Sequence, residues 1–330
     1  MPHVPYVWAL VMAARDPSQL NVLVTGATGA IGGALLPRLV GAGHAVRAFA
    51  RDPARVPVDG LRAVVRGDAV AGTGLDEALL GVDVAYFLIH SMEAVPAADP
   101  AVAPFGERER RAATAFARAA AAAGVRRIVY LGGIVPSGAQ LSAHLASRLE
   151  VEEILLAAAP EAVALRAPIV VGARSRSFRF LVRLVERVPV MPLPNWRDNR
   201  TAPIDGRDVM AYLVAAGTWP AVGGALSLDI AGPEVITYGA MIERIRDALL
   251  VGRPRVDLPL RITALTSRVA AAIAGEDPAL IEPLMGSLGN DLLPRDDRAR
   301  ELFGVRLHAF DAAVERALRD WEAEEELAAR

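Results

Sequence analysis

At 330 residues the chain is long enough for one large α/β domain with an appended lobe, or for two modest domains with separate cores. Apolar residues make up 53% of it and charged residues 22%, which predicts a packed globular protein and excludes a disordered chain. The formal net charge of −2 leaves no basic surface for nucleic acid, and the absence of cysteine excludes disulfides, thiolate metal sites and cysteine nucleophiles.

Two further exclusions come from the basic residues and from the start of the chain. Every basic residue apart from histidine is arginine, so lysine Schiff-base chemistry is excluded, and the five scattered histidines predict no metal site. The apolar run at residues 7–14 is about half as long as a membrane span and has no basic segment before it. We therefore interpret residues 1–19 as an N-terminal extension, and expect no membrane insertion and a cytoplasmic location.

Strands and helices alternate along the first half of the chain. Residues 22–24 predict a strand, a glycine cluster follows, and residues 34–40 predict a helix that stops at Gly41. Further strands are predicted at residues 45–50, 61–65, 84–89, 127–131 and 162–171, with helices at residues 74–80, 107–123 and 141–157. This order is typical of a doubly wound parallel sheet of the Rossmann type.

Beyond Gly172 the pattern loosens. We expect a helix at 178–188, a proline-rich turn at 189–194, a seventh strand at 225–230, and helices at 238–249, 262–274 and 309–328. We assign residues 20–172, with 203–230 returning, to an NAD(P)-binding Rossmann domain, and residues 173–202 and 231–330 to a smaller, mainly helical substrate lobe. Within this lobe Phe178, Phe180, Met191 and Trp196 could line an apolar substrate pocket, although core packing is the commoner role of such residues.

The glycine cluster is the strongest functional signal. Gly26, Gly29 and Gly32 stand between a predicted strand and a predicted helix, where they permit a tight turn and bring a helix N-terminus towards a pyrophosphate. A tight turn without a ligand is the alternative. Arg51, at the end of the second strand, can accept a 2′-phosphate, which favours NADP(H) over NAD(H), while Asp52 could instead reach a ribose hydroxyl.

Several segments carry a family resemblance. The spacing Gly-x-x-Gly-x-x-Gly after Thr25 resembles the short-chain dehydrogenase/reductase superfamily. The segments YFLIHS at 86–91, IVYLGG at 128–133, LRAPIVVG at 165–172 and PIDGRDV at 203–209 are similar to its atypical, NmrA-like branch, and within it to bacterial NAD(P)-binding proteins resembling an accessory subunit of respiratory complex I. The similarity spans about residues 20–316.

The resemblance implies a cofactor site and a catalytic Ser, Tyr and Lys. Asp68 resembles the aspartate that contacts adenine. The expected cofactor-binding residues are Thr25, Gly26, Thr28, Gly29, Ala30, Ile31, Gly32, Arg51, Asp68, Ile89, His90, Ser91, Leu131, Gly132, Gly133, Arg148, Pro168 and Ile169. The catalytic set is not kept, because Gly132 and Gly133 stand where the serine is expected, and His144 and Arg148 occupy the positions of the Tyr-x-x-x-Lys dyad.

We therefore expect His144 as the general acid and Arg148 as the positive charge that holds the nicotinamide ribose. A hydrogen-bonded structural histidine is the alternative for His144. The leading hypothesis is an NADP(H)-dependent reductase of a carbonyl, imine or activated double bond on a small apolar substrate. The alternatives are a non-catalytic NADP(H) sensor or assembly protein with a protein partner and, last, a sugar-nucleotide epimerase or dehydratase.

Asp205, Arg207 and Asp208 form a further charged cluster, which we interpret as structural. They stand at a predicted helix start, where Asp208 suits the positive end of the helix dipole.

Overall fold

The computed structural model describes residues 19–56, 58–90, 104–136, 138, 141–257, 264–325 and 327. Almost all of the predicted N-terminal extension and the predicted cofactor residue Ser91 lie outside these ranges. Among the described helices, none combines the length and the apolar character that crossing a bilayer requires.

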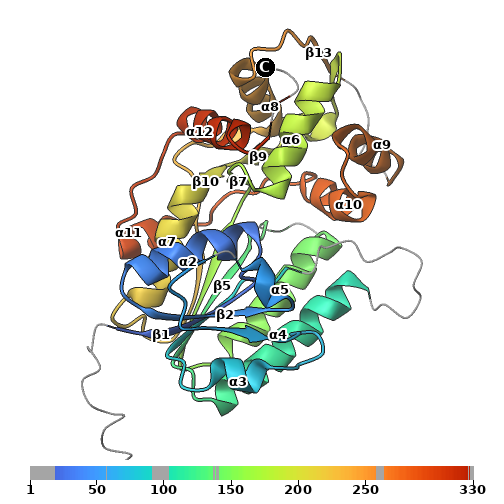
Figure 1. Cartoon of the computed structure of the whole chain (residues 1–330). Coiled ribbons are helices and arrows are strands. Elements are labelled where there is room, and N and C mark those ends of the chain that lie inside the picture. Colours follow the sequence, from blue (N-terminus) through green and yellow to red (C-terminus); the bar gives the residue numbers. More distant parts are fainter. Residues whose placement is uncertain are drawn as a thin grey trace, which may run out of the picture.

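Seven parallel strands form the central sheet, in the order β11-β6-β5-β4-β1-β2-β3 (Figure 1). They are β1 (Asn21–Thr25), β2 (Ala45–Ala50), β3 (Ala63–Arg66), β4 (Val84–Phe87), β5 (Arg127–Gly133), β6 (Glu161–Ala167) and β11 (Ala225–Asp229). All seven predicted strands are therefore present, and the predicted doubly wound parallel sheet is confirmed. The strand order reverses between β1 and β4, which is the position where such sheets open a ligand crevice at their carboxyl ends.

Both faces of the sheet are covered by helices. Because side chains alternate along a strand, Val22 and Val24 of β1 pack on one face and Leu23 on the other, all at most 1% exposed. The first face is covered by α2 (Ala30–Gly41), α7 (Gly206–Thr218) and α11 (Arg298–Phe303). The second face is covered by α3 (Leu75–Leu79), α4 (Phe105–Ala122) and α5 (Ala143–Leu156).

The structure differs from the sequence predictions at several boundaries. Helix α2 begins at Ala30, not at residue 34, so it follows the glycine turn directly. The strand predicted over 162–171 is two strands, because Pro168 has no N–H to donate to the ladder. After Pro168, β7 (Val170–Val171) leaves the main sheet and pairs with β10 (Ile204–Asp205).

No bounds were predicted from the sequence for three of the described helices: α7, α10 (Pro278–Ser287) and α11. Helix α7 is buried over much of its surface, with Val209, Met210, Tyr212 and Leu213 buried on both sides of the exposed Ala211, so it lacks the narrow apolar stripe that reveals an amphipathic helix. Helix α11 has six residues, too few to show a helical period. The predicted terminal helix is shorter than expected, at Phe310–Glu322 (α12).

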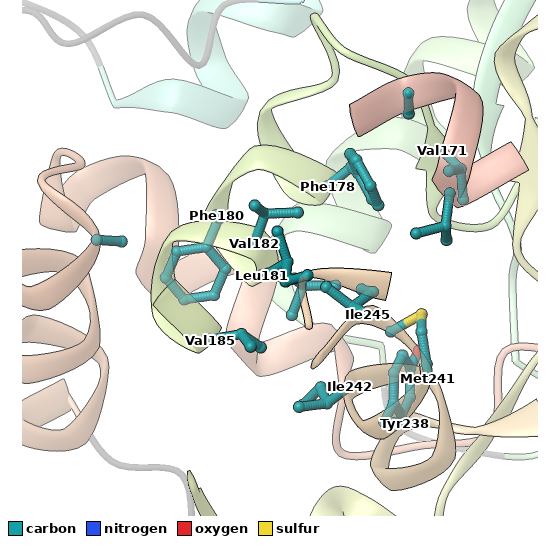
Figure 2. Packing of buried hydrophobic residues seen from close by; sticks show 14 of the residues in the cluster. Val171, Phe178, Phe180, Leu181, Val182, Val185, Tyr238, Met241, Ile242 and Ile245 are labelled. Atoms are coloured by element: carbon teal, nitrogen blue, oxygen red, sulfur yellow. The ribbon is translucent and has the colours of Figure 1, made fainter. Parts of the chain in front are cut away.

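The lobe lies above the sheet in Figure 1 and has its own apolar core. It consists of α6 (Arg176–Arg187), α8 (Tyr238–Ala248), α9 (Ala264–Ala274), α10 and α12, with the short strands β8 (Met191–Leu193), β9 (Arg200–Thr201), β12 (Ile236–Thr237) and β13 (Arg255–Asp257) and the 3₁₀ turn η2 (Asn195–Asp198). Figure 2 shows Phe178, Phe180 and Leu181 of α6 packed with Ile242 and Ile245 of α8.

All four residues that could have lined an apolar pocket, Phe178, Phe180, Met191 and Trp196, are buried in this core. Core packing is therefore their role.

A buried arginine of the sheet forms hydrogen bonds to the end of α7. Arg127, at the start of β5, is fully buried and donates to the carboxylate of Glu161 at 2.6 Å and to the carbonyl oxygens of Ala216, Gly217 and Trp219. These carbonyls lie at the end of α7, where a helix leaves acceptors unsatisfied. The arginine therefore caps α7 and fixes its position on the sheet.

The charged cluster at the start of α7 is structural, as predicted. Asp205 caps the helix by accepting from the backbone N–H of Arg207, whose guanidinium lies 2.5 Å from the same carboxylate. Asp208 accepts from both the backbone N–H and the ring of His308, at 2.9 Å and 2.6 Å.

Candidate functional site

A cavity of about 1050 Å³ lies between the carboxyl ends of the sheet strands and the lobe. Its floor is formed by the segments that follow β1, β2, β3, β4 and β6, and its other wall by α6 and α12. Of the expected cofactor residues, Gly26, Thr28, Gly29, Ala30, Ile31, Gly32, Arg51, Asp68, Ile89, His90 and Pro168 line it. The cavity thus crosses the switch point between β1 and β4, where a dinucleotide binds in this type of sheet.

The glycine turn is shaped so that no side chain can enter it. Gly26 has φ of +66°, and a Cβ there would lie 2.4 Å from the carbonyl oxygen of Leu88. A Cβ on Gly32 would lie 2.3 Å from the carbonyl oxygen of Gly26. Gly29, the N-cap of α2, has no side chain to cap the helix, so the first N–H groups of α2 are available to an anion in the cavity. These features fit the pyrophosphate of a dinucleotide.

One end of the cavity is rich in arginine. Arg38, Arg51 and Arg55 line it after α2 and β2, and Asp68 lines it after β3. Asp68 also shapes its own turn, because its carboxylate accepts from the backbone N–H groups of Val70 and Ala71 at 2.8 Å and 3.3 Å. Positive charge therefore exceeds negative charge at the end where the adenosine half of a dinucleotide lies.

Asp52 caps a 3₁₀ turn and does not reach into the site where a ribose hydroxyl would bind. Its carboxylate accepts from the backbone N–H of Ala54 at 3.2 Å and caps the 3₁₀ turn η1 (Pro53–Arg55). It does not line the cavity.

Six of the expected cofactor residues that the structure describes lie outside the cavity wall, namely Thr25, Leu131, Gly132, Gly133, Arg148 and Ile169. Thr25 has a structural task, because its hydroxyl donates to the carbonyl of Tyr86 at 3.0 Å and accepts from the N–H of Leu88 at 3.2 Å. It thereby fixes the end of β4 beside the glycine turn. At Gly132, where the family's serine is expected, a Cβ would lie 2.9 Å from the ring of Tyr130.

A cluster of charged side chains lies at the other end of the cavity. Nδ1 of His90 lies 3.0 Å from Oε1 of Glu109, and Nη1 of Arg148 lies 3.4 Å from Oε2 of the same carboxylate. The Glu109 side chain is 2% exposed and that of Arg148 is 9% exposed, whereas that of His90 is 36% exposed and lines the cavity. Arg148 also donates to the carbonyl of Leu131. Its guanidinium is thus bound inside the protein and does not line the cavity.

His144 packs beside this cluster. Its ring centroid is 5.3 Å from that of His90 and 6.0 Å from that of Phe105, and it does not line the cavity. Burial, reinforced by the neighbouring His90 and Arg148, lowers the pKa of His144 to about 3, and its buried Nδ1 has no hydrogen-bond partner within the described ranges. At neutral pH the ring is neutral, so the catalytic role expected for His144 stays a prediction that the geometry does not favour.

No tyrosine is among the described residues that line the cavity. Tyr130 lies near the cluster, but its hydroxyl donates to the carbonyl of Arg148 at 3.1 Å, and burial raises its pKa above the ordinary value. It therefore does not replace the tyrosine that the family uses.

Several residues of the cavity region were missed in the sequence. Arg38, Arg55 and Arg176 line the cavity, and Glu109 lies behind it. A signal for Glu109 exists, since it shares one helical face with Ala112, Ala113 and Phe116, all buried, and a carboxylate on an apolar face needs a partner. The arginines carry no comparable pattern, because the chain has arginines throughout.

Comparisons with known proteins agree with this geometry. A family model described as NAD(P)H-binding matches residues 26–166. A (4-alkanoyl-5-oxo-2,5-dihydrofuran-3-yl)methyl phosphate reductase of Streptomyces griseus is 30% identical over 310 residues, which cover 92% of this chain and 97% of that protein. A ceramide reductase of Caulobacter vibrioides is 32% identical over 61% of this chain and 62% of that protein.

A solved structure shares the fold. A short-chain dehydrogenase/reductase superfamily protein of Agrobacterium tumefaciens with bound NAD superposes with a TM-score of 0.66 at 21% identity, covering 92% of this chain and 99% of that one. The parallel sheet with its cavity, the NAD(P)H-binding family model and the reductase relative together identify an NAD(P)-dependent oxidoreductase of the Rossmann type. More particularly, the chain belongs to the atypical short-chain dehydrogenase/reductase superfamily.

Proposed function

We propose that the protein is an NADPH-dependent reductase of a carbonyl, an imine or an activated double bond on a small apolar substrate. The observation that carries this proposal is the continuous cavity, which joins the glycine turn to Arg38, Arg51 and Arg55 on one side and to His90 on the other. When bound there, NADPH supplies a hydride. The similarity to the two reductases supports the direction of the reaction.

The preference for NADPH is supported by charge. Arg38, Arg51 and Arg55 are placed to meet a 2′-phosphate, and charge-assisted hydrogen bonds to a phosphate contribute about 1.5–3 kcal/mol each. A carboxylate at the end of β2 would favour NADH, but Asp52 is held on the backbone of η1. Loss of Arg51 therefore weakens NADPH binding more than NADH binding.

The apolar character of the substrate is supported by the wall opposite the glycine turn. Leu284 of α10 and Ala313 and Ala317 of α12 line the cavity there, together with Val170 and Val171 of β7. Charged residues line the same wall, namely Arg174, Arg176, Arg316, Asp320 and Glu324, so the support for an apolar substrate comes from the apolar part of the wall. The family's epimerase and dehydratase chemistry is not favoured, because the Tyr and Lys on which it relies are absent from the expected positions.

The proposal is tested by following NADPH oxidation at its absorbance maximum with three probes: a medium-chain methyl ketone, a cyclic imine and an alkanoyl dihydrofuranone. We expect turnover with at least one of them, and a slower reaction at limiting NADPH in Arg51→Ala. Arg66→Ala is the matched control, because Arg66 is an exposed arginine at the end of β3 that does not line the cavity. Tight NADPH binding without turnover on any probe would favour the alternative, a non-catalytic NADP(H) sensor or assembly protein.

Membership of the NmrA-like branch, a cytoplasmic location and a protein partner stay predictions of the sequence resemblance and composition. They are independent of the experiment above.

A further inference from the structure

In the part of the chain that the structure describes, no tyrosine lines the cavity, so the proposed reductase needs a proton donor other than the tyrosine that is ordinary in this superfamily. Among the described residues that line the cavity, His90 is the one whose ordinary pKa lies near neutrality. The carboxylates there are acceptors at neutral pH, and arginine does not release a proton in proteins. The hydroxyls of Ser175 and Ser177, which line the wall, lie 3.2 Å from each other and form a hydrogen bond between themselves.

His90 occupies the half of the cavity where the reacting end of the nucleotide lies. It follows β4 directly, on the opposite side of the switch point from Arg51. Since the adenosine half of a dinucleotide lies over β1 to β3, the nicotinamide half lies over β4 to β6. His90 is therefore in the half of the cavity where the nicotinamide would bind.

The ring of His90 is oriented by Glu109. Nδ1 is engaged by the buried carboxylate at 3.0 Å, and Arg148 holds the other oxygen of that carboxylate. Nη1 of Arg148 also lies 3.3 Å from Nδ1 of His90, but the carboxylate is closer and favours the tautomer in which Nδ1–H donates to Glu109. In that tautomer the second ring nitrogen is Nε2, for which the described residues provide no hydrogen-bond partner. This is the arrangement of a histidine whose tautomer is fixed by a carboxylate while its second nitrogen exchanges a proton with substrate.

We propose that His90, oriented by Glu109, is the proton donor of this reductase. The proposal rests on the proposed reductase function. In the step, the hydride from NADPH reaches the carbonyl carbon, NADP⁺ is formed, and the proton on Nε2 of the His90 imidazolium passes to the carbonyl oxygen. The substrate becomes an alcohol, His90 becomes neutral, and it regains its proton from solvent through its exposed side.

The charges around His90 determine the direction of the pH dependence. Loss of solvent contact lowers the pKa of His90, the positive charges of Arg148 on α5 and Arg176 on α6 lower it further, and Glu109 on α4 raises it. The neutral ring of His144 on α5 also packs against it. Because the reduction needs the protonated ring, kcat/KM falls as pH rises through the pKa of His90, by about tenfold per pH unit above it.

The first test compares variants in the reduction of whichever of the three probes the wild-type protein reduces fastest. We expect His90→Gln to lower kcat/KM by about 100-fold or more and to abolish the pH dependence, with a much smaller effect on NADPH affinity than on turnover. Glu109→Gln shifts the pH profile to lower pH by about one unit or more. His308→Gln is the matched control, because His308 also pairs with a buried carboxylate but does not line the cavity.

The second test does not depend on turnover. In the NMR spectrum of protein labelled with ¹³C at histidine Cε1, the signal that disappears in His90→Gln belongs to His90. Following that signal in the wild-type protein against pH gives the pKa of His90 directly. We expect Glu109→Gln to lower that pKa by about one unit or more, and bound NADP⁺ to change it. A His90 pKa that is the same with and without the Glu109 carboxylate would refute the orienting role.

The two proposals fail in different ways. If wild-type protein turns over but His90→Gln retains its rate and pH profile, the donor role is wrong while the reductase function stands. Loss of activity in His144→Gln with retention in His90→Gln would return the role to His144. If wild-type protein reduces none of the probes, the reductase function and the donor role are both refuted. If Glu109→Gln does not fold, His90→Gln still tests the donor role, because the His90 side chain is partly exposed and its replacement should leave the fold intact.

Discussion

The buried His144 predicts an acid-dependent loss of stability. Its folded pKa of about 3 lies below the ordinary 6.5, so the folded state excludes the proton that the unfolded chain accepts. The stabilisation is fully present above the unfolded pKa and is lost as pH falls towards 3. The stabilisation lost between pH 7 and about pH 4.5 amounts to about 2.5 kcal/mol, since one pKa unit corresponds to about 1.36 kcal/mol.

His144→Leu isolates this contribution, because leucine fills a similar volume and does not titrate. We expect urea unfolding to show that the wild type loses about 2.5 kcal/mol more than His144→Leu between the two pH values. At pH 7 the variant is at least as stable as the wild type, because the buried Nδ1 that lacks a partner is removed. Equal losses in the two proteins would show that His144 titrates normally, and would refute the reasoning from burial.

Two other predictions concern the fold around the site. Gly32→Ala introduces a Cβ 2.3 Å from the carbonyl oxygen of Gly26, so we expect a strain of about 1–3 kcal/mol. The strain should appear as a lower melting temperature and weaker NADPH binding. Gly33→Ala is the control that we expect to be tolerated, because its Cβ would lie 3.4 Å from the nearest atom, the carbonyl oxygen of Ala27. Arg127→Met leaves the Glu161 carboxylate without its buried partner and α7 without its cap, so chemical denaturation should show a loss of about 3–5 kcal/mol, whereas a loss below about 1 kcal/mol would contradict the capping role.

The cofactor end of the site could be predicted from the sequence because its determinants are local. The glycine turn needs only the spacing of Gly26, Gly29 and Gly32 and a strand and helix on either side. Arg51 follows from the end of β2 in the same way. The parallel sheet could also be predicted, since alternating strands and helices permit few topologies.

The other end of the cavity, where we propose that the proton is donated, could not be predicted in the same way, because it joins residues from three elements. His90 follows β4, Glu109 lies on α4 and Arg148 on α5, and only the packing of both helices on one face of the sheet brings them together. The family pattern directed attention to His144 and Arg148, which occupy the expected sequence positions but point into the protein interior. That His90 lines the cavity depends on tertiary structure, so no local sequence motif indicates it.

The central claim is that the cavity is an NADPH site, and calorimetric titration with NADPH and NADH tests it most directly. We expect NADPH to bind at least about tenfold more tightly than NADH, an advantage that Arg51→Ala removes and Arg66→Ala keeps. Binding of neither nucleotide by the folded protein would contradict the claim, and equal binding of both would contradict the preference for the 2′-phosphate.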